Sequence, residues 1–179
     1  MSAALSGKDW FERADHFHYT SLFLLQQPAP MYGIYGYPHI VMKAFAAEAF
    51  LKSLLTIEGK GVPHIHDLLK LFDKLSQESR REIQRRWDTG SASQLRNMRA
   101  QVTPGLRVPK NMRDALDQSS NAFLDWRYHP KGSKIAFTVM SFPHYVRCRI
   151  LELEPSWAHT PPHPLASLNP DDEDRRAIG

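Results

Sequence analysis

The chain has 179 residues, 42% of them hydrophobic, and a formal net charge of +4. This length allows one well-covered hydrophobic core and is short for two ordinary domains. The single cysteine excludes a disulfide framework within the chain and a multi-cysteine zinc site. No secretory signal is visible, and no apolar run approaches the roughly 20 residues of a membrane span, so we expect a cytoplasmic protein without membrane association.

Apolar residues at helical spacing predict a first helix over about residues 8–25. Its expected apolar side carries Trp10, Ala14, Phe17 and either Phe23 or Leu24. The next segment, residues 26–38, contains three prolines and two glycines, which is typical of an ordered loop.

A second helix is predicted over about residues 39–57, beginning after Pro38 and ending before Gly59 and Gly61. A third helix is expected to begin at His66 or Asp67, where aspartate can cap exposed amides. It continues through Leu75 and toward Ile83. Because the turn between these helices is short, we expect an antiparallel pair in which the 44–55 stripe packs on the 68–75 stripe.

Glu48 lies inside the apolar stripe of the second predicted helix, together with Ala44, Ala47, Leu51, Leu54 and Leu55. A buried carboxylate is costly unless it is paired, so the sequence requires a donor. The candidates are Lys52, His66 and Arg127. Such a pair can border a nucleotide or phosphate site, or it can fix the register of two helices, and we favour the second interpretation.

Later segments give weaker signals. Residues 88–109 are expected to form a long connection, and residues 112–127 a helix that turns Arg127 inward. Residues 134–142 fit either a strand or the start of a helix. A last helix is predicted from Pro143 to Glu154, with a narrow apolar stripe and with its arginines away from the core.

Residues 155–179 are rich in proline and charge and predict a flexible or draped tail. The sequence therefore predicts an all-α, antiparallel bundle of four to six helices over residues 8–154.

Basic residues gather between Arg80 and Arg113, where nine lysines and arginines stand against Glu82 and Asp88. This local excess of seven positive charges is larger than the excess of the whole chain. Such a segment attracts phosphate groups or acidic partners, although a solvated helix face has the same composition. The expected basic patch comprises Arg80, Arg81, Arg85, Arg86, Arg96 and Arg99.

Three segments occur in a recognisable order: FAAEAFLKSLL, then HIHDLLKLFDKL, then SSNAFLDWRY. In this order the chain resembles the HEPN (higher eukaryotes and prokaryotes nucleotide-binding) family. The matched positions are Glu48, Lys52, His66, Asp67, Leu68, Arg127 and Tyr128. The resemblance implies a helical bundle of RNA-processing, toxin–antitoxin or phage-defence systems, a homodimer, and RNA, a nucleotide, a nucleotidyltransferase or an antitoxin protein as partner.

Ribonuclease members of that family carry an arginine followed, after four to six residues, by a histidine in a late helix. Here Arg127 is followed by His129 instead. Arg13 and His18 have the required spacing but lie in the first predicted helix. Arg13, His18 and His129 are therefore weak catalytic candidates, and we favour a binding module over its alternatives, a metal-independent dimeric endoribonuclease or a structural dimerisation domain.

His64 and His66 lack a third ligand nearby. Neither a metal site nor a cofactor is predicted.

Overall fold

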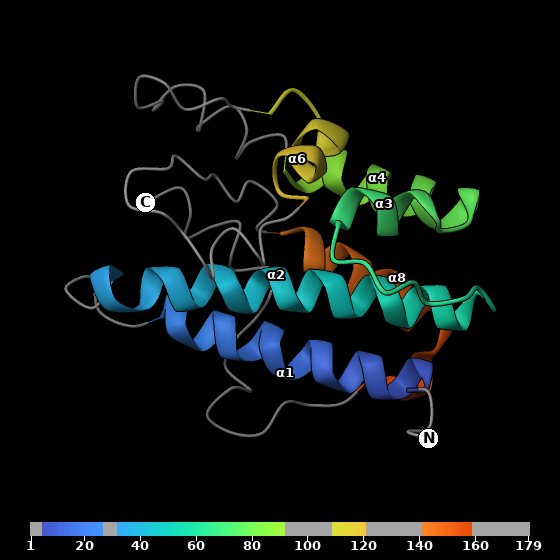
Figure 1. Ribbon diagram of the computed structural model, residues 1–179, viewed down its shortest axis with the longest axis horizontal. Helices are drawn as coiled ribbons and strands as arrows, with labels where there is room; N and C mark the ends of the chain where they lie inside the picture. The colour runs from blue at the N-terminus through green and yellow to red at the C-terminus, as the bar shows by residue number, and fades with distance from the viewer. Residues whose placement is uncertain (1–4, 27–31, 92–108, 121–140, 159–179) are drawn as a thin grey trace.

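The computed structural model describes residues 5–26, 32–91, 109–120 and 141–158, and within these ranges all regular secondary structure is helical (Figure 1). The predicted all-α class is therefore confirmed. The elements are α1 Gly7–Leu25, α2 Tyr32–Ile57, α3 Leu68–Asp73, α4 Gln77–Gly90, α6 Met112–Gln118, α8 Phe142–Leu153 and a 3-10 turn, η2, Pro155–Trp157. Among the described helices, none combines the length and apolar character that a membrane crossing needs.

Helices α1 and α2 run antiparallel along most of their lengths (Figure 1). Helix α1 begins with a capping box, in which the Ser6 hydroxyl accepts from the Asp9 amide and the Asp9 carboxylate accepts from the Ser6 amide. The predicted apolar side of α1 was only partly right. The buried residues of α1 are Gly7, Phe11, Ala14, Asp15, His18, Tyr19, Ser21 and Leu22.

Trp10 and Phe17 lie only partly in the core, and Phe23 is 42% exposed. The buried face of α1 is thus rotated from the predicted one. It includes a buried aspartate and a buried histidine, which a prediction from apolar residues alone leaves out.

Helix α2 begins at Tyr32, so the prediction of a loop up to Pro38 was wrong for residues 32–38. Proline in a helix interior removes one backbone hydrogen bond. The helix nevertheless continues through Pro38, and it packs against α1. The predicted end at Ile57 is confirmed, and Gly59 follows it in the left-handed conformation, with φ of 67°.

Helix α3 runs in the same direction as α2, which corrects the predicted antiparallel pair. His66, before α3, contacts Glu48 in the middle of α2, whereas Ser76, after α3, donates its amide to Glu58 beyond the end of α2. The connection over residues 58–67 returns alongside α2 instead of turning tightly (Figure 1). The predicted contact between the two apolar stripes is nevertheless present in the core.

The predicted third helix divides in two near Ser76, which caps α4 by accepting from the Ser79 amide. Helix α4 then runs back past α8 and contacts α6. Its buried face carries Ser79, Ile83 and Trp87, at steps of four residues.

Helix α8 packs against α2 and α4. Of the predicted apolar stripe, Val146 and Ile150 are buried, whereas Leu153 is 38% exposed. Arg147 and Arg149 are also buried, contrary to the expectation that the arginines of this helix avoid the core. At its end, Trp157 of η2 packs on Phe11, with ring centroids 5.5 Å apart.

Several predictions fall outside the described residues: most of the 88–109 connection, the helix beyond residue 120, the strand-or-helix segment 134–140 and the tail from residue 159. The described residues on either side test the ends of two of these segments. Helix α4 extends to Gly90, and Met112 and Leu116 are buried in α6, as their spacing predicted.

Candidate functional site

Glu48 lies in the core as predicted, and two of its three expected donors contact it. The Lys52 ammonium donates to Oε1 at 2.7 Å, and His66 Nδ1 donates to both carboxylate oxygens at 3.0 Å. The Lys52 ammonium also lies 5.2 Å from the centre of the Trp10 ring, which favours its positive charge. The third candidate donor, Arg127, is outside the described residues.

This cluster explains how a carboxylate is tolerated inside α2. The side chains of Glu48 and Lys52 are 10% and 8% exposed, whereas that of His66 is 49% exposed. Asp67 acts as the N-cap of α3 by accepting from the Lys70 amide, and its carboxylate also pairs with the Lys70 ammonium. Tyr128, matched in the same resemblance, lies outside the described residues.

A second buried ion pair was missed by the sequence analysis. Arg147 of α8 donates to Asp15 of α1, with Nε 2.7 Å from Oδ1. The guanidinium also lies 5.7 Å from the Phe11 ring centre and 5.6 Å from that of Tyr19. A signal was present, because Asp15 follows Phe11 and precedes Tyr19 at steps of four residues.

The weak catalytic candidates do not form a surface site. Arg13 is exposed, whereas His18 is completely buried, so the two do not meet. Burial, reinforced by the nearby charge of Lys43, holds the pKa of His18 well below its ordinary value. A buried neutral imidazole does not reach a substrate on the surface, and His129 lies outside the described residues.

Other imidazoles surround His18. Its ring stacks on that of His144, with centroids 6.4 Å apart, and His39 donates Nδ1–H to the Ser21 carbonyl at 2.8 Å. Burial and Lys43 lower the pKa of His39 to about 4. His18 and His39 are therefore neutral core residues at ordinary pH. In the part of the chain that the structure describes, no three His, Cys, Asp or Glu side chains converge in a group that could hold a metal ion.

Four arginines of the expected basic patch lie on α4, and Arg96 and Arg99 are outside the described residues. Two of the four are engaged by one carboxylate. Arg85 donates twice to Glu82, at 2.9 and 2.6 Å, and Arg86 Nε lies 2.9 Å from the same carboxylate and also pairs with Glu152. The hydrogen bond from Arg85 is the main cause that lowers the pKa of Glu82 to about 2.

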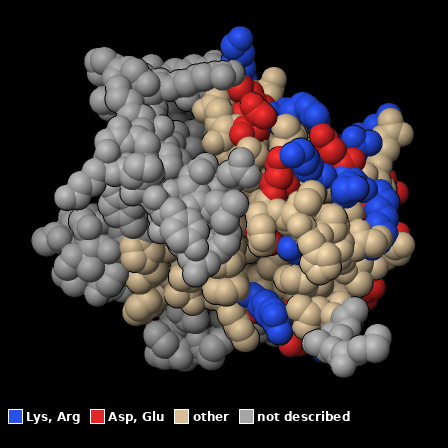
Figure 2. All heavy atoms as spheres, viewed as in Figure 1, with Lys and Arg blue, Asp and Glu red and all other residues tan. Residues whose placement is uncertain are grey.

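Basic and acidic side chains therefore alternate over this region. Helix α4 carries three carboxylates, Glu78, Glu82 and Asp88, beside its four arginines. In Figure 2 blue and red atoms lie side by side over the described part of this face. The arginines of the predicted basic patch on α4 are therefore interspersed with carboxylates.

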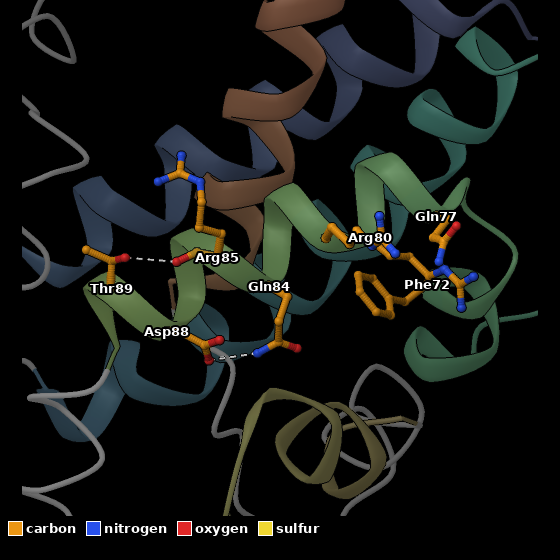
Figure 3. A pocket seen from close by; sticks show the side chains of 8 residues that line it. Phe72, Gln77, Arg80, Gln84, Arg85, Asp88 and Thr89 are labelled. Carbon is orange, nitrogen blue, oxygen red and sulfur yellow. Dashed lines mark hydrogen bonds between the residues drawn. The ribbon is translucent and has the colours of Figure 1, made fainter.

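Arg80 and Arg81 differ from the other arginines of α4, because neither forms an ion pair with any described residue. Arg81 is exposed, and Arg80 is half-buried with its Nε atom shielded from solvent and without a hydrogen-bond partner. Both line a pocket of about 600 Å³. Its described lining is Phe72, Gln77, Arg80, Arg81, Gln84, Arg85, Asp88 and Thr89 (Figure 3).

The pocket follows one face of α4. Gln77, Arg81, Gln84 and Asp88 are separated by steps of four, three and four residues, which places them on one side of a helix. The Gln84 amide donates to Asp88 Oδ1 at 2.7 Å (Figure 3). The arrangement thus offers two unpaired guanidinium groups toward the start of α4 and a carboxylate toward its end, and it can bind a polar ligand that carries both an anion and donor groups.

Comparison with models of protein families, with curated proteins and with solved structures finds no match.

Proposed function

We propose that this chain is a HEPN-like helical module that binds RNA, with Arg80 and Arg81 as its phosphate-binding residues on α4. The observation that carries the proposal is that these two arginines line a pocket without a carboxylate partner among the described residues. Of the other described arginines, Arg85, Arg86, Arg113, Arg147 and Arg149 are each engaged by an acidic side chain. Arg13 has no such partner among the described residues either, but it is an exposed residue of α1 outside this pocket.

An unpaired guanidinium is the better ligand for phosphate. It presents a planar set of donors that matches two phosphate oxygens, and no internal bond must be broken before it binds. Arg85, by contrast, must leave the carboxylate of Glu82. The number of useful cationic contacts is therefore smaller than the number of arginines in the sequence.

The size and polarity of the pocket also support a nucleotide-containing ligand. Its volume of about 600 Å³ falls within the range of roughly 300–1,000 Å³ that is common for small-molecule sites. The basic balance of the chain, with a pI near 9.3, favours approach of a polyanion. Binding through phosphate contacts predicts an affinity that falls steeply as salt increases.

The test is the affinity for a short fluorescent single-stranded RNA, measured by anisotropy at low salt. For Arg80→Gln with Arg81→Gln we expect at least a tenfold loss, since a hydrogen bond to a charged group is worth about 1.5–3 kcal/mol. The matched control is Lys8→Gln with Arg13→Gln, which removes the same charge from exposed positions of α1. Equal losses of affinity in the two double variants would show that binding depends on net charge alone, and would contradict this site.

Dimerisation and a nucleotidyltransferase or antitoxin partner, which the resemblance to the HEPN family implies, remain predictions. Sedimentation equilibrium of the purified chain tests the first. Co-purification with a partner encoded beside it tests the second.

A further inference from the structure

We propose that the α4 pocket selects an unpaired nucleobase that carries an amino group, with Asp88 and Gln84 as the specificity-determining residues. The inference rests on the proposed RNA binding and deepens it, because it assigns the second end of the same pocket. It follows from a feature that a simple phosphate site would not contain, which is a carboxylate in the lining.

The two ends of the pocket have opposite chemistry. Arg80 and Arg81 supply donors and positive charge, whereas Asp88 supplies acceptors and negative charge about two helical turns later. Seven residues of helix separate Arg81 from Asp88, which corresponds to about 10 Å along the axis. A phosphate is attracted to the first end and repelled from the second, so the second end requires a different part of the ligand.

The hydrogen bond between Gln84 and Asp88 determines what that part must be. The Gln84 amide group donates to Asp88 Oδ1 at 2.7 Å, which directs one of its N–H donors at the carboxylate. The Gln84 carbonyl oxygen and the second carboxylate oxygen have no hydrogen-bond partner among the described residues and remain as two acceptors, against one remaining N–H donor of the Gln84 amide. Two acceptors of this kind are satisfied by a ligand that donates.

Amino groups of nucleobases provide such donors. Cytosine presents N4–H₂ and adenine N6–H₂, whereas a uracil presents a carbonyl oxygen at the corresponding position. At that position the carbonyl of uracil offers the carboxylate no proton, and the single donor of its pairing edge is the ring N3–H. Guanine, like cytosine and adenine, carries an amino group, N2–H₂. Bases with an amino group are therefore favoured, and uracil is disfavoured.

The base must also be unpaired. In a duplex the amino groups are already used in base pairing, and the deep major groove of A-form RNA does not admit side chains to the base edges. An unpaired base can instead turn out of its strand and lie beside the guanidinium plane of Arg80 or Arg81, a common mode of single-strand recognition. The pocket thus fits a phosphate and the base attached to it.

The experiment compares oligocytidylate, oligoadenylate and oligouridylate of equal length, and a duplex, by anisotropy at one salt concentration. For the unsubstituted chain we expect cytidylate and adenylate to bind about tenfold more tightly than uridylate and more tightly than the duplex. Asp88→Asn keeps the side-chain size but replaces an acceptor by a donor, and we expect it to reduce this preference to less than about twofold.

The matched control is Glu78→Gln, which removes one negative charge from the same helix outside this pocket. Glu78 pairs with Arg149 instead. We expect Glu78→Gln to tighten the binding of all oligomers by a similar factor and to leave the preference unchanged. A preference that is unchanged in Asp88→Asn, or lost equally in Glu78→Gln, overturns the role of Asp88.

The failure of this inference is distinguishable from failure of the proposed function. Equal binding of the three oligomers that is still lost in the Arg80, Arg81 double variant overturns base selection and leaves phosphate binding in place. Binding of the duplex as tight as that of the single strands overturns the requirement for an unpaired base. No binding of any oligomer at low salt overturns both proposals.

Discussion

Arg147 of α8 and Asp15 of α1 form a buried ion pair that connects the first described helix to the last α-helix. Two bonds join them, at 2.7 and 3.2 Å, and the side chains are 10% and 1% exposed. Burial opposes the charge of Arg147, but the hydrogen bond from its guanidinium to Asp15 more than offsets this, so the pKa of Arg147 is raised. The Arg147 guanidinium is therefore held in its charged form beside the Asp15 carboxylate.

Replacing Arg147 by Met should destabilise the fold by about 3–5 kcal/mol, because it leaves the Asp15 carboxylate buried without its partner. The control is Arg113→Met, which breaks a pair with Asp73 whose arginine is 59% exposed. That change should cost at most about 1 kcal/mol. Urea denaturation followed by circular dichroism measures both, and equal losses would contradict the structural role of the Asp15 pair.

The Glu48 cluster predicts unequal contributions from its two donors. Lys52→Met removes a buried ammonium and should cost about 3 kcal/mol, since the carboxylate then loses its main charge partner. His66→Gln removes a contact from a half-exposed ring and should cost about 1 kcal/mol. The same denaturation experiment ranks them, and a larger loss for His66→Gln would show that the histidine is the main partner of Glu48.

Stability should fall as the pH is lowered from about 6.5 toward 4. His18 and His39 have lower pKa values in the folded protein than the ordinary value of 6.5, so the unfolded chain binds more protons in this window. The shift of His39 to about 4 corresponds to on the order of 3 kcal/mol. Denaturation between pH 7 and 4.5 measures the slope.

In the same titration His39→Asn should flatten the slope, because asparagine keeps a donor near the Ser21 carbonyl but does not titrate. His16→Asn changes an exposed histidine and should leave the slope as it is. A stability that is constant from pH 7 to 4.5 would show that these imidazoles are not held neutral in the folded chain.

Gly90 lies where α4 meets Tyr145 of α8. A Cβ atom at this position would overlap the Tyr145 hydroxyl, whereas one at Gly61 would meet nothing within 4 Å. Gly90→Ala should therefore cost about 1–3 kcal/mol and Gly61→Ala less than about 0.5 kcal/mol in thermal or urea denaturation. Adding Tyr145→Phe should recover part of the loss, and no recovery would show that the overlap is relieved in another way.

Local signals predicted much of the fold. The periodicity of residues 8–25, the glycine after Ile57 and the capping aspartate before α3 each depend on neighbours in sequence. They correctly indicated the extent of α1, the end of α2 and the start of α3. The inward position of Glu48 and its contact with Lys52 also follow from spacing on one helix.

Features that depend on tertiary contacts were not predicted. Pro38 predicted a helix start, but α2 begins at Tyr32 and passes through it. The direction of α3 depends on the path of residues 58–67, which local propensity does not determine. Asp15 and Arg147 are far apart in sequence, so each resembles a solvated charge until the helices meet.

The candidate site was likewise predicted in its local features and not in its tertiary contacts. The sequence identified the arginines of α4, but only the geometry separates Arg85 and Arg86, which Glu82 engages, from Arg80 and Arg81, which no described carboxylate engages. Charge counting treats all four alike, because it does not include how neighbouring side chains pair. The proposal rests on Arg80 and Arg81, the arginines of α4 that have no ion pair with a described carboxylate.

The most direct test of RNA binding by Arg80 and Arg81 is the salt dependence of affinity, measured for the unsubstituted chain and for Arg80→Gln with Arg81→Gln. Each phosphate contact to a single strand contributes about 0.7 to the slope of log affinity against log salt. We predict that the double variant binds more weakly and that its slope is shallower by about 1.4. An unchanged slope would contradict the assignment of these two arginines as the phosphate ligands.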